Sequence, residues 1–337
     1  MPTEALDDRT STYLEAIACA LREEMRRDSR VFLMGQDVAD YGGVFKLTQG
    51  LKDEFSEDRV VNTPIAESGT IGMAVGAALL GERPVVEIQF ADFVSCGFNQ
   101  LVNVAAKMYY RTQLSVPLVV RLPSGGGVGA GPFHSQNVEA WFLHVPGLKV
   151  VAPSFAEDAY VLMKAAIRDP NPVLYVEHKY LYRREKGLLP RPQDVSDESL
   201  SRVRAGARVV RSGDDVTVLS YGWMVHRCLE AAEALSAQGV AAEVVDLRVL
   251  APLDDETIAR SVKKNGKVLI VHEAPLTGGF GAEIAARISE HCFEHLDAPP
   301  RRLAYPDTPV PHQRPVEAES LPNPTSIAQA IRELHKW

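Results

Sequence analysis

The feature that most constrains the fold is a regular alternation of short apolar β-rich runs with longer helical patterns. In the first half, the β-rich runs cover residues 31–34, 85–88, 117–121, 149–151 and 173–176, and the helical patterns cover residues 11–28, 67–80, 93–110, 136–143 and 155–168. Because strands that are apolar on both faces need helices on both faces, this alternation predicts a parallel sheet covered on two sides.

The alternation is interrupted once and then returns. Periodicity is lost over residues 183–208, which contain several prolines and charges of both signs, so we interpret this segment as a linker. A chain of 337 residues also exceeds the size of a single core, which stops growing near about 250–300 residues. We therefore expect an α/β domain over residues 1–185, a linker over residues 186–208 and a smaller α/β domain over residues 209–337. The second set of β-rich runs covers residues 216–221, 242–247, 268–272 and 302–305, and its helical patterns cover residues 224–237, 254–264, 280–294 and 324–335.

Composition and charge narrow the classes of partner and compartment. The hydrophobic fraction of 46% is that of a globular protein, and a net charge of −8 argues against nucleic acid or an anionic membrane as the main partner. A basic protein module remains electrostatically suitable. The sequence begins without a basic segment followed by an apolar run, so we expect no secretory signal. The four cysteines form no C-x-x-C pair, which favours a reducing compartment: the bacterial cytoplasm, or the mitochondrial matrix in a eukaryote.

Glu67 stands where a strand ends and a helix is expected to begin, in the segment Thr63-Pro-Ile-Ala-Glu-Ser-Gly. One interpretation is structural, because a carboxylate in the first turn of a helix is favoured by the helix dipole. The glycines at 69, 72 and 76 weaken a helix, however, and suit a place where a ligand or another helix approaches the backbone closely. The pattern alone leaves both interpretations open.

The segment Glu87-Ile-Gln-Phe-Ala-Asp-Phe follows the next β-rich run. Ligands of open α/β sheets bind at the carboxyl ends of the strands, so Gln89 and Phe93 are candidates to face a ligand there. A single phenylalanine is more often part of a core.

A glycine-rich segment, Pro123-Ser-Gly-Gly-Gly-Val-Gly-Ala-Gly-Pro-Phe-His-Ser-Gln, follows the third β-rich run. A dinucleotide fingerprint fits it only in the permissive form Gly125-x-Gly127-x-x-Ala130, and Pro132 interrupts the expected helix start. We favour a mobile loop that delivers His134 to a cleft over a dinucleotide site. A solvent loop with a surface histidine is the alternative.

Two further segments carry histidines. His272 and Glu273 end a β-rich run in the second unit, and a catalytic role is about as well supported as a structural or docking role. His291 and His295 are four residues apart in a helical pattern, but two ligands on one face do not make a zinc site, so we expect a solvated helix.

Taken in order along nearly the whole chain, these segments resemble the β subunit of the thiamine-diphosphate-dependent first component of 2-oxo-acid dehydrogenase complexes. The motifs that carry the resemblance are long: Thr63-Pro-Ile-Ala-Glu-Ser-Gly, Phe133-His-Ser-Gln and Ala166-Ile-Arg-Asp-Pro-Asn-Pro. Within the family, Lys179-Tyr-Leu-Tyr-Arg and His272-Glu-Ala-Pro-Leu-Thr-Gly-Gly-Phe look closest to branched-chain (2-oxoisovalerate) dehydrogenases, with pyruvate and acetoin dehydrogenases as alternatives.

The resemblance implies a transketolase-type pyrimidine-binding domain followed by a transketolase C-terminal-type α/β domain. It implies that Glu67 activates thiamine diphosphate by hydrogen bonding to its pyrimidine ring. It places Phe93 against the pyrimidine face and Ile65 and Gln89 along the same pocket. His134 matches a histidine at the mouth of the active site that moves protons as the acyl group passes to a lipoyl arm.

The resemblance also implies a structural K⁺ ion, bound mostly through backbone carbonyls. The matching positions are Leu118, Ala166, Ile167, Asp169 and Asn171, although Pro170 departs from some relatives.

The chain contains no Gly-Asp-Gly segment, which in this superfamily begins the Mg²⁺ and diphosphate site. The resemblance therefore implies a composite active site in an α₂β₂ heterotetramer, in which a separate α subunit holds the Mg²⁺. It further implies a β–β contact through the C-terminal domain and docking to the subunit-binding domain of the lipoyl acyltransferase core.

Two other classes of function are weaker. A nicotinamide-dinucleotide dehydrogenase would rest on the defective glycine fingerprint. A non-catalytic scaffold subunit is disfavoured because Glu67, Phe93 and His134 are all present. The preferred 2-oxo acid is not fixed by this chain, since one methylene is worth only about 1–3 kcal/mol in an apolar pocket.

Overall fold

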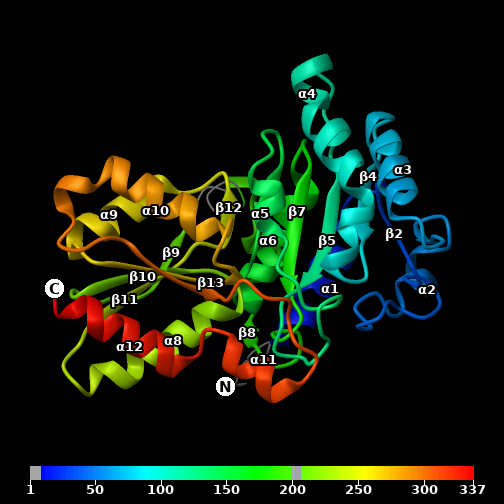
Figure 1. Ribbon diagram of the computed structural model, residues 1–337. Helices are drawn as coiled ribbons and strands as arrows, with labels where there is room; N and C mark the ends of the chain where they lie inside the picture. Colours follow the sequence, from blue (N-terminus) through cyan, green and yellow to red (C-terminus); the bar gives the residue numbers. More distant parts are fainter. Residues whose placement is uncertain (1–8, 199, 201–205) are drawn as a thin grey trace, which may run out of the picture.

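The computed structural model describes residues 9–198, 200 and 206–337 and contains two large sheets that lie side by side (Figure 1). The strands of the larger sheet, in spatial order, are β12 (Val249–Ala251), β6 (Lys149–Val151), β7 (Val173–His178), β5 (Val119–Ser124), β4 (Arg83–Glu87), β2 (Val31–Gly35) and β3 (Val60–Asn62). Those of the smaller sheet are β14 (Arg301–Tyr305), β13 (Val268–Pro275), β10 (Val216–Ser220), β11 (Ala242–Asp246) and β9 (Arg208–Arg211). Only the edge strands β12 and β9 run antiparallel to their neighbours, so the predicted parallel α/β fold is confirmed.

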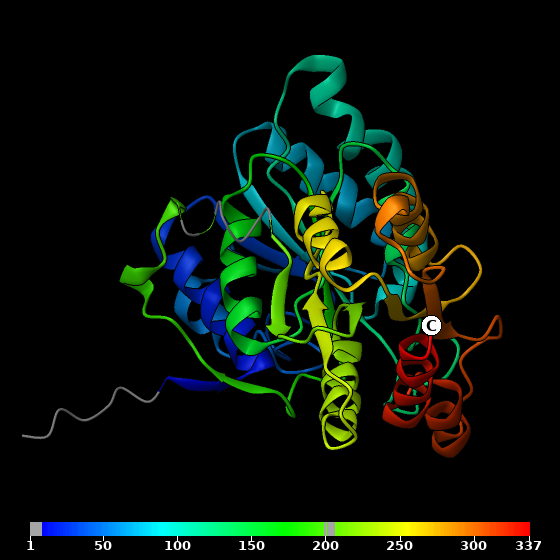
Figure 2. The same ribbon diagram turned by 90° about the vertical axis from the view of Figure 1, so that its left-hand side faces the viewer.

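Helices cover both faces of each sheet. On one face of the larger sheet α1 (Tyr13–Arg27) packs on α6 (Ala156–Arg168), drawn in blue and green in Figure 2. The opposite face carries α3 (Glu67–Leu79), η1 (Ala91–Gly97), η2 (Gln100–Ala105), α4 (Ala106–Thr112) and α5 (Glu139–Leu143). The smaller sheet lies between α8 (Trp223–Ser236) with α12 (Pro324–His335) and α9 (Asp255–Asn265) with α10 (Phe280–His291). Short elements complete the fold: α2 (Leu51–Phe55), η3 (Pro192–Asp194), η4 (Phe293–His295) and α11 (Arg314–Ser320).

Two apolar cores follow from this layering, and each runs past both sheets. Successive strand residues point to opposite faces, so Val85 belongs to the core under α1 and α6 while Val86 belongs to the core under α3 and α5. Residues of α8 and α12 continue the first core, and residues of α9 and α10 continue the second. The two sheets are therefore joined by shared layers of apolar side chains.

Three segments differ from the sequence-based expectation. Part of the predicted linker, β8 (Lys186–Leu188), pairs with β1 (Thr10–Thr12) as a separate two-stranded sheet. The larger sheet takes its edge strand β12 from the second half of the chain. The helix predicted over residues 93–110 changes its hydrogen-bond spacing along its length, from 3₁₀ in η1 through a π-helical stretch in η2 to α4. Such π-helical stretches are frequent near functional sites.

A buried ion cluster lies within the larger sheet. Arg121 of β5 bonds to Glu177 of β7 at 2.6 and 2.9 Å and also pairs with Glu87 of β4, and all three side chains are buried. Tyr182 donates a further hydrogen bond to Glu177. Burial would lower the pKa of Arg121, but the two carboxylates hold it above its ordinary value, so the guanidinium stays charged and joins three strands.

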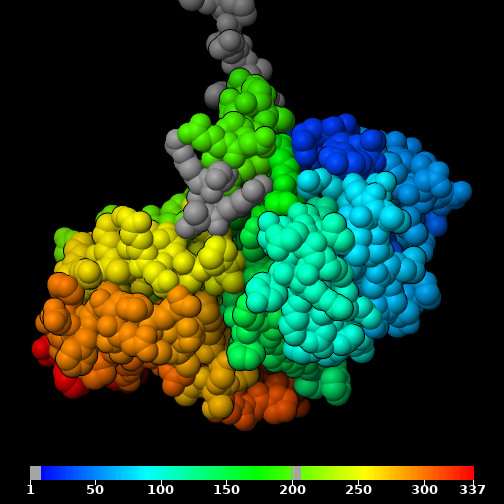
Figure 3. All heavy atoms as spheres, turned by 90° about the horizontal axis from the view of Figure 1, so that it is seen from above, coloured from blue at the N-terminus to red at the C-terminus, as the bar shows by residue number. Residues whose placement is uncertain are grey.

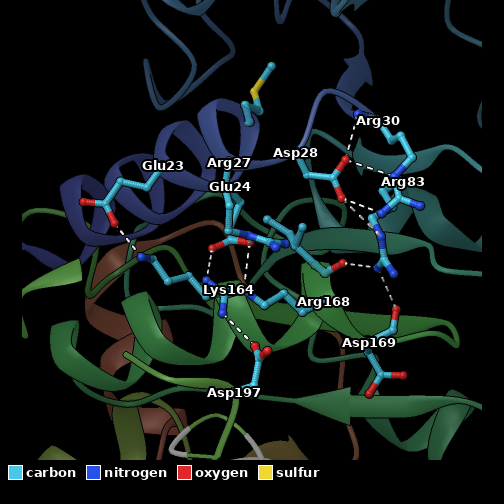
Figure 4. A network of polar contacts seen from close by, with 12 residues as sticks. Glu23, Glu24, Arg27, Asp28, Arg30, Arg83, Lys164, Arg168, Asp169 and Asp197 are labelled. Atoms are coloured by element: carbon cyan, nitrogen blue, oxygen red, sulfur yellow. Dashed lines mark hydrogen bonds and ion pairs between the residues drawn. The ribbon is translucent and has the colours of Figure 1, made fainter. Parts of the chain in front are cut away.

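A second polar network ties α1 to α6 on the outside of the same sheet (Figure 4). Arg168 of α6 bonds to Glu24 of α1 at 2.7 Å and to Asp197 at 2.8 Å. Arg83, at the start of β4, donates to the carbonyl oxygen of Ile167 at 2.7 Å, and this hydrogen bond fixes the turn between α6 and β7.

Within the described part of the chain, no helix combines the length and the apolar character that a membrane crossing requires.

Candidate active site

Glu67 is the first residue of α3, as predicted, and it lies at the carboxyl edge of the larger sheet. No side chain caps this helix, so the free amides of its first turn and the Glu67 carboxylate share one corner of the molecule. Gln36, which follows β2, donates from Nε2 to Glu67 Oε1 at 3.2 Å. The carboxylate is half-buried, so Gln36 orients it while part of it remains accessible.

The surface beside Glu67 is open and apolar. Ile65, two residues before α3, is 83% exposed, and Met73 of α3 and Leu80 at its C-cap are also exposed. A Cβ added to Gly76 would meet nothing within 4 Å, and one added to Gly69 would meet only Ala66. Within the described residues, this face of α3 is therefore open around Gly69 and Gly76, whereas Gly72 has a close neighbour from elsewhere in the chain, the Gln100 side chain.

Phe93 and Gln89 lie at the same edge. Gln89 is half-buried two residues after the end of β4, and Phe93 lies in η1, which packs on the first turn of α3. This packing is close, since a Cβ on Gly97 would stand 3.4 Å from the carbonyl oxygen of Glu67. The structure thus packs η1, the element that contains Phe93, against the helix that carries Glu67.

His134 reaches this edge from the glycine-rich loop. Its ring lies 5.5 Å from that of Phe93 and 4.5 Å from that of Phe90, both in edge-to-face geometry. The sequence analysis missed Phe90, although it is part of the same Ile88-Gln-Phe-Ala-Asp-Phe segment. His134 is therefore not an isolated surface histidine, because two aromatic rings contact it.

The glycine-rich loop is held firmly on both sides, whereas we expected a mobile segment. Gly125 N–H donates to Gln136 O at 3.3 Å and closes the loop, and Gln136 N–H donates to Asp92 at 3.1 Å. The loop also contacts the second domain through Glu273 and Glu317. Gly126 N–H donates to Glu273, which forms an ion pair with His178 at 2.7 Å.

Glu273 and His272 are buried and form their polar contacts with other groups of the chain. Burial alone would raise the pKa of Glu273, but the charge of His178, together with hydrogen bonds from His178 and Gly126, holds it below its ordinary value. His272 is buried, faces the carbonyl oxygen of Ala274 with Nδ1 at 3.0 Å, and has a pKa lowered to about 4 by burial. Neither residue lies among the aromatic rings around His134, so the catalytic alternative for this pair gains no support from geometry.

His291 and His295 do not share a helical face, because α10 ends at His291 and η4 begins at Phe293. The predicted helix over residues 280–294 is therefore shorter than expected.

The five residues matched to a K⁺ site gather in one corner, but protein cations already bind their oxygens. Lys149 Nζ contacts both carboxylate oxygens of Asp169 at 2.7 and 2.6 Å, and Arg83 takes the Ile167 carbonyl. The Leu118 carbonyl accepts from Val173 N–H, and the Ala166 carbonyl accepts from Asp169 N–H. Asn171 Oδ1 is buried without a hydrogen-bond partner among the described residues. The Lys149 ammonium therefore already supplies a positive charge at the Asp169 carboxylate, while the backbone carbonyls each keep a second lone pair.

The edge around Glu67 does suit the pyrimidine end of thiamine diphosphate. It offers an oriented carboxylate that can accept a ring N–H, an aromatic side chain for ring contact, and an apolar side chain that remains in solvent without a ligand. One side of the edge is open, so the residues present form part of a pocket.

Comparisons with known proteins agree with the fold and identify the family. The family described as the transketolase pyrimidine-binding domain matches residues 9–185, and the transketolase C-terminal domain family matches residues 205–327. The chain is 49% identical to the 2-oxoisovalerate dehydrogenase subunit beta of Bacillus subtilis over 329 residues, which are 97% of this chain and 99% of that protein. It is 43% identical to a mitochondrial pyruvate dehydrogenase E1 component subunit beta of Oryza sativa, covering 95% of this chain and 85% of that protein.

A solved structure described as a split-gene transketolase, an inactive β4 tetramer, superposes with a TM-score of 0.78 over 96% of this chain and 98% of its own. At 22% identity this likeness supports the fold alone. The matched domains and the near-complete alignment to the curated relatives lead to one conclusion: the chain belongs to the transketolase-like family of β subunits of 2-oxo-acid dehydrogenase first components.

Proposed function

We propose that this chain provides the pyrimidine-binding half of a thiamine diphosphate site in a branched-chain 2-oxo-acid dehydrogenase. The observation that carries the proposal is the Glu67 carboxylate at the start of α3, oriented by Gln36 and open on one side. When bound, thiamine diphosphate supplies an electron sink that allows a 2-oxo acid to lose CO₂. The protein contributes orientation and proton positions, which are its usual tasks in a cofactor enzyme.

In this proposal Glu67 holds a proton on the pyrimidine ring and keeps the ring in the tautomer that activates the cofactor. Phe93 packs against the ring, and Ile65 and Gln89 line the same pocket. Glu67 is suited to this role because its carboxylate is half-buried and accepts only one hydrogen bond from a side chain of the described residues.

His134 is proposed to move protons at the mouth of the site while the acyl group passes to a lipoyl arm. In that transfer the acyl carbon forms a bond to one lipoyl sulfur. The electron pair that the acyl group gives up reduces the disulfide, and the second sulfur takes a proton. A histidine held between aromatic rings at the edge of the site is placed to deliver that proton.

We propose that the open face of α3 is covered by an α subunit in an α₂β₂ heterotetramer. The chain lacks the Gly-Asp-Gly segment for Mg²⁺ and diphosphate, so those ligands are assigned mainly to the α subunit. The exposed Ile65, Met73 and Leu80 supply apolar surface for the contact. α4 extends beyond the sheet on the same side, as Figure 1 shows, and its surface is teal in Figure 3. Tyr110 of α4 is 91% exposed and adds to this apolar surface.

The remaining contacts are proposed from the family alone. The C-terminal domain, residues 209–337, is assigned the β–β contact, with residues 186–208 as the connection from the pyrimidine-binding domain. The acyltransferase core is assigned as a docking partner through its basic subunit-binding domain, which suits a chain of net charge −8. We further propose that the protein is located in the cytoplasm of a bacterium. We also propose that the Lys149 ammonium, in place of K⁺, stabilises the residues around Asp169.

Glu67→Gln in the reconstituted α/β enzyme tests the activation role. The amide has nearly the same shape but cannot carry the charge, so decarboxylation of 2-oxoisovalerate should fall by about 10²–10⁴-fold. The matched control is Glu82→Gln, an exposed carboxylate just beyond α3, which should leave the rate unchanged. Decarboxylation within a factor of two of wild type in Glu67→Gln would refute the role.

Substrate preference needs a separate comparison. Steady-state kinetics of the same α/β pair with 2-oxoisovalerate, pyruvate and acetoin should give the highest kcat/KM for 2-oxoisovalerate. A higher kcat/KM for pyruvate or acetoin would reassign the substrate and leave the role of Glu67 intact.

A further inference from the structure

Three amides of the glycine-rich loop point at two carboxylates of the second domain. Gly126 N–H donates to Glu273, while Gly127 N–H and Gly129 N–H donate to the two oxygens of Glu317 at 2.9 and 2.8 Å. Glu317 lies in α11, nearly 190 residues away along the chain, and only 1% of its surface is exposed. The Glu317 carboxylate thus accepts hydrogen bonds from the loop at two positions.

Glu317 is held there without a cationic hydrogen-bond partner. Within the described chain, no lysine, arginine or histidine nitrogen forms an ion pair with it, and its side-chain hydrogen bonds come from the two loop amides. Burial lowers the pKa of Lys179 to about 8, and the charge of the nearby Glu317 opposes this shift. Burying a carboxylate is costly unless it is hydrogen-bonded, so the loop amides are what makes this position tolerable.

The shape of the loop depends on this contact. A Cβ on Gly127, which has φ +76°, would stand 2.7 Å from the Trp223 ring, and one on Gly129 would stand 2.6 Å from Arg314. The glycines therefore let the second domain approach the loop backbone closely enough for the carboxylates to reach the amides.

Apolar packing alone does not fix the loop. A cavity of about 210 Å³ lies behind it, lined by loop residues such as Pro132 and Ser135 and by Trp141, Glu273 and Tyr305. His134 N–H donates to Gly131 O at 3.3 Å, so the histidine is tied to the backbone that Glu317 holds two residues earlier, at Gly129. Movement of that backbone into the cavity would carry the imidazole away from Phe90 and Phe93.

We propose that Glu317, assisted by Glu273, is a positioning residue through which the second domain holds His134 over Phe90 and Phe93. This inference rests on the proposed role of His134 and extends it to a residue that touches neither cofactor nor substrate. Loss of the contact should impair transfer of the acyl group to the lipoyl arm more than it impairs loss of CO₂, because Glu67 lies on a different element.

Glu317→Gln in the assembled α/β enzyme is the test. Glutamine keeps the shape but replaces one of the two acceptor oxygens with an NH₂ donor, so one of the two loop amides would face a donor instead of an acceptor. Hydrogen–deuterium exchange of the peptide covering residues 123–136 should be about 10-fold faster or more. Acylation of a free lipoyl domain should fall about 10-fold, with decarboxylation, measured with an artificial electron acceptor, within about twofold.

The matched control is Glu319→Gln, an exposed carboxylate on the same helix, which should change neither measurement. If Glu317→Gln does not assemble, Glu317→Asp serves instead, because the side chain is one methylene shorter and draws both oxygens back from the loop amides. It should give smaller changes in the same direction. Unchanged hydrogen–deuterium exchange of the loop in either variant would overturn the inference that Glu317 holds the loop. Faster exchange with unchanged lipoyl acylation would overturn the positioning role.

A double variant separates this inference from the proposed function. In a His134→Ala background, Glu317→Gln should cause no further loss of lipoyl acylation, and an additional loss of the full size would overturn the coupling. If His134→Ala alone leaves acylation unchanged, the proposed role of His134 fails, and the positioning role fails with it. Loop exchange needs no substrate, so it still reports whether Glu317 holds the loop.

Discussion

The glycines of α3 and those of the loop that carries His134 have opposite surroundings. Around the loop, an added Cβ at Gly127 or Gly129 would collide with side chains of the second domain. On α3, Gly76 faces open space and Gly69 meets only Ala66, while Ile65 stands exposed beside them. Both regions are glycine-rich and both border the same edge of the sheet. The chain itself explains the first set of glycines, whereas no close contact with another element of the described chain explains Gly69 and Gly76.

Polar groups show the same contrast. The loop amides, Glu273 and Glu317 bond to one another across the two domains, whereas Glu67 accepts from Gln36 and is otherwise open. A region that satisfies its own groups is complete in the single chain. The region around Glu67 leaves an oriented carboxylate and apolar surface uncovered, and it is the region that we propose another subunit covers.

The largest effect on the free energy of unfolding is expected from acid, through the buried His272 of the second domain. The pKa of His272 is about 4 in the folded chain and 6.5 in the unfolded chain, so the unfolded state gains a proton as the pH falls below 6.5 while the folded state does not. The stability that His272 contributes is therefore present above pH 6.5 and is lost as the pH falls towards 4. We expect a loss of about 2–3 kcal/mol between pH 7 and pH 4.5 in urea unfolding.

His272→Gln should reduce that acid-dependent loss, and the exposed His291→Gln should not. Equal pH dependence in the His272 variant and in wild type would show that the buried imidazole is not the group responsible.

Gly127→Ala should be the more harmful of two glycine substitutions. Its φ of +76° and the nearby Trp223 ring make a methyl group strained and crowded, so the free energy of unfolding should fall by about 1–3 kcal/mol. Urea unfolding of the single chain measures this directly. A neutral effect would mean that the loop and the second domain are not in close contact.

Gly76→Ala should have the opposite sign in the single chain. Because the position is helical and open, alanine should raise the free energy of unfolding by about 0.5–1 kcal/mol. The same variant should weaken assembly with the α subunit, as measured by sedimentation, because a close-packed partner would meet the new methyl group. Stabilisation with unchanged assembly would place the partner elsewhere.

The smallest effect is expected from exchanging the cation in the buffer. Since Lys149 already pairs with Asp169, the melting temperature should be the same in potassium chloride and in choline chloride. Lys149→Met should lower it, and in that variant potassium should restore part of the loss. A wild-type protein that melts higher in potassium would show that K⁺ displaces the lysine.

Much of the fold was predictable because it depends on local patterns. Strands such as β2, β6 and β7 are apolar on both faces, and helices such as α1 and α6 have helical periodicity. The edge strand β12 and the β1–β8 pair were not predicted, since three-residue strands with distant partners leave no periodic signal. The change of hydrogen-bond spacing through η1, η2 and α4 has no sequence signature either.

The site was predictable where residues follow strand ends or belong to long family motifs. Glu67, Phe93 and His134 were predicted in this way, and the structure brings Phe93 and His134 together. Glu317 was missed because it lies in a separate part of the chain, and its meaning depends on two amides nearly 190 residues away. Lys149 at Asp169 was missed for the same reason, because ion pairs between distant elements leave no pattern.

Binding of thiamine diphosphate to the single chain tests the central claim most directly. Calorimetric titration with Mg²⁺ present should show no saturable binding to this chain alone up to millimolar cofactor, and tight binding once the α subunit is added. Tight binding and turnover by the single chain would contradict a composite site and would require the diphosphate ligands to lie within this sequence.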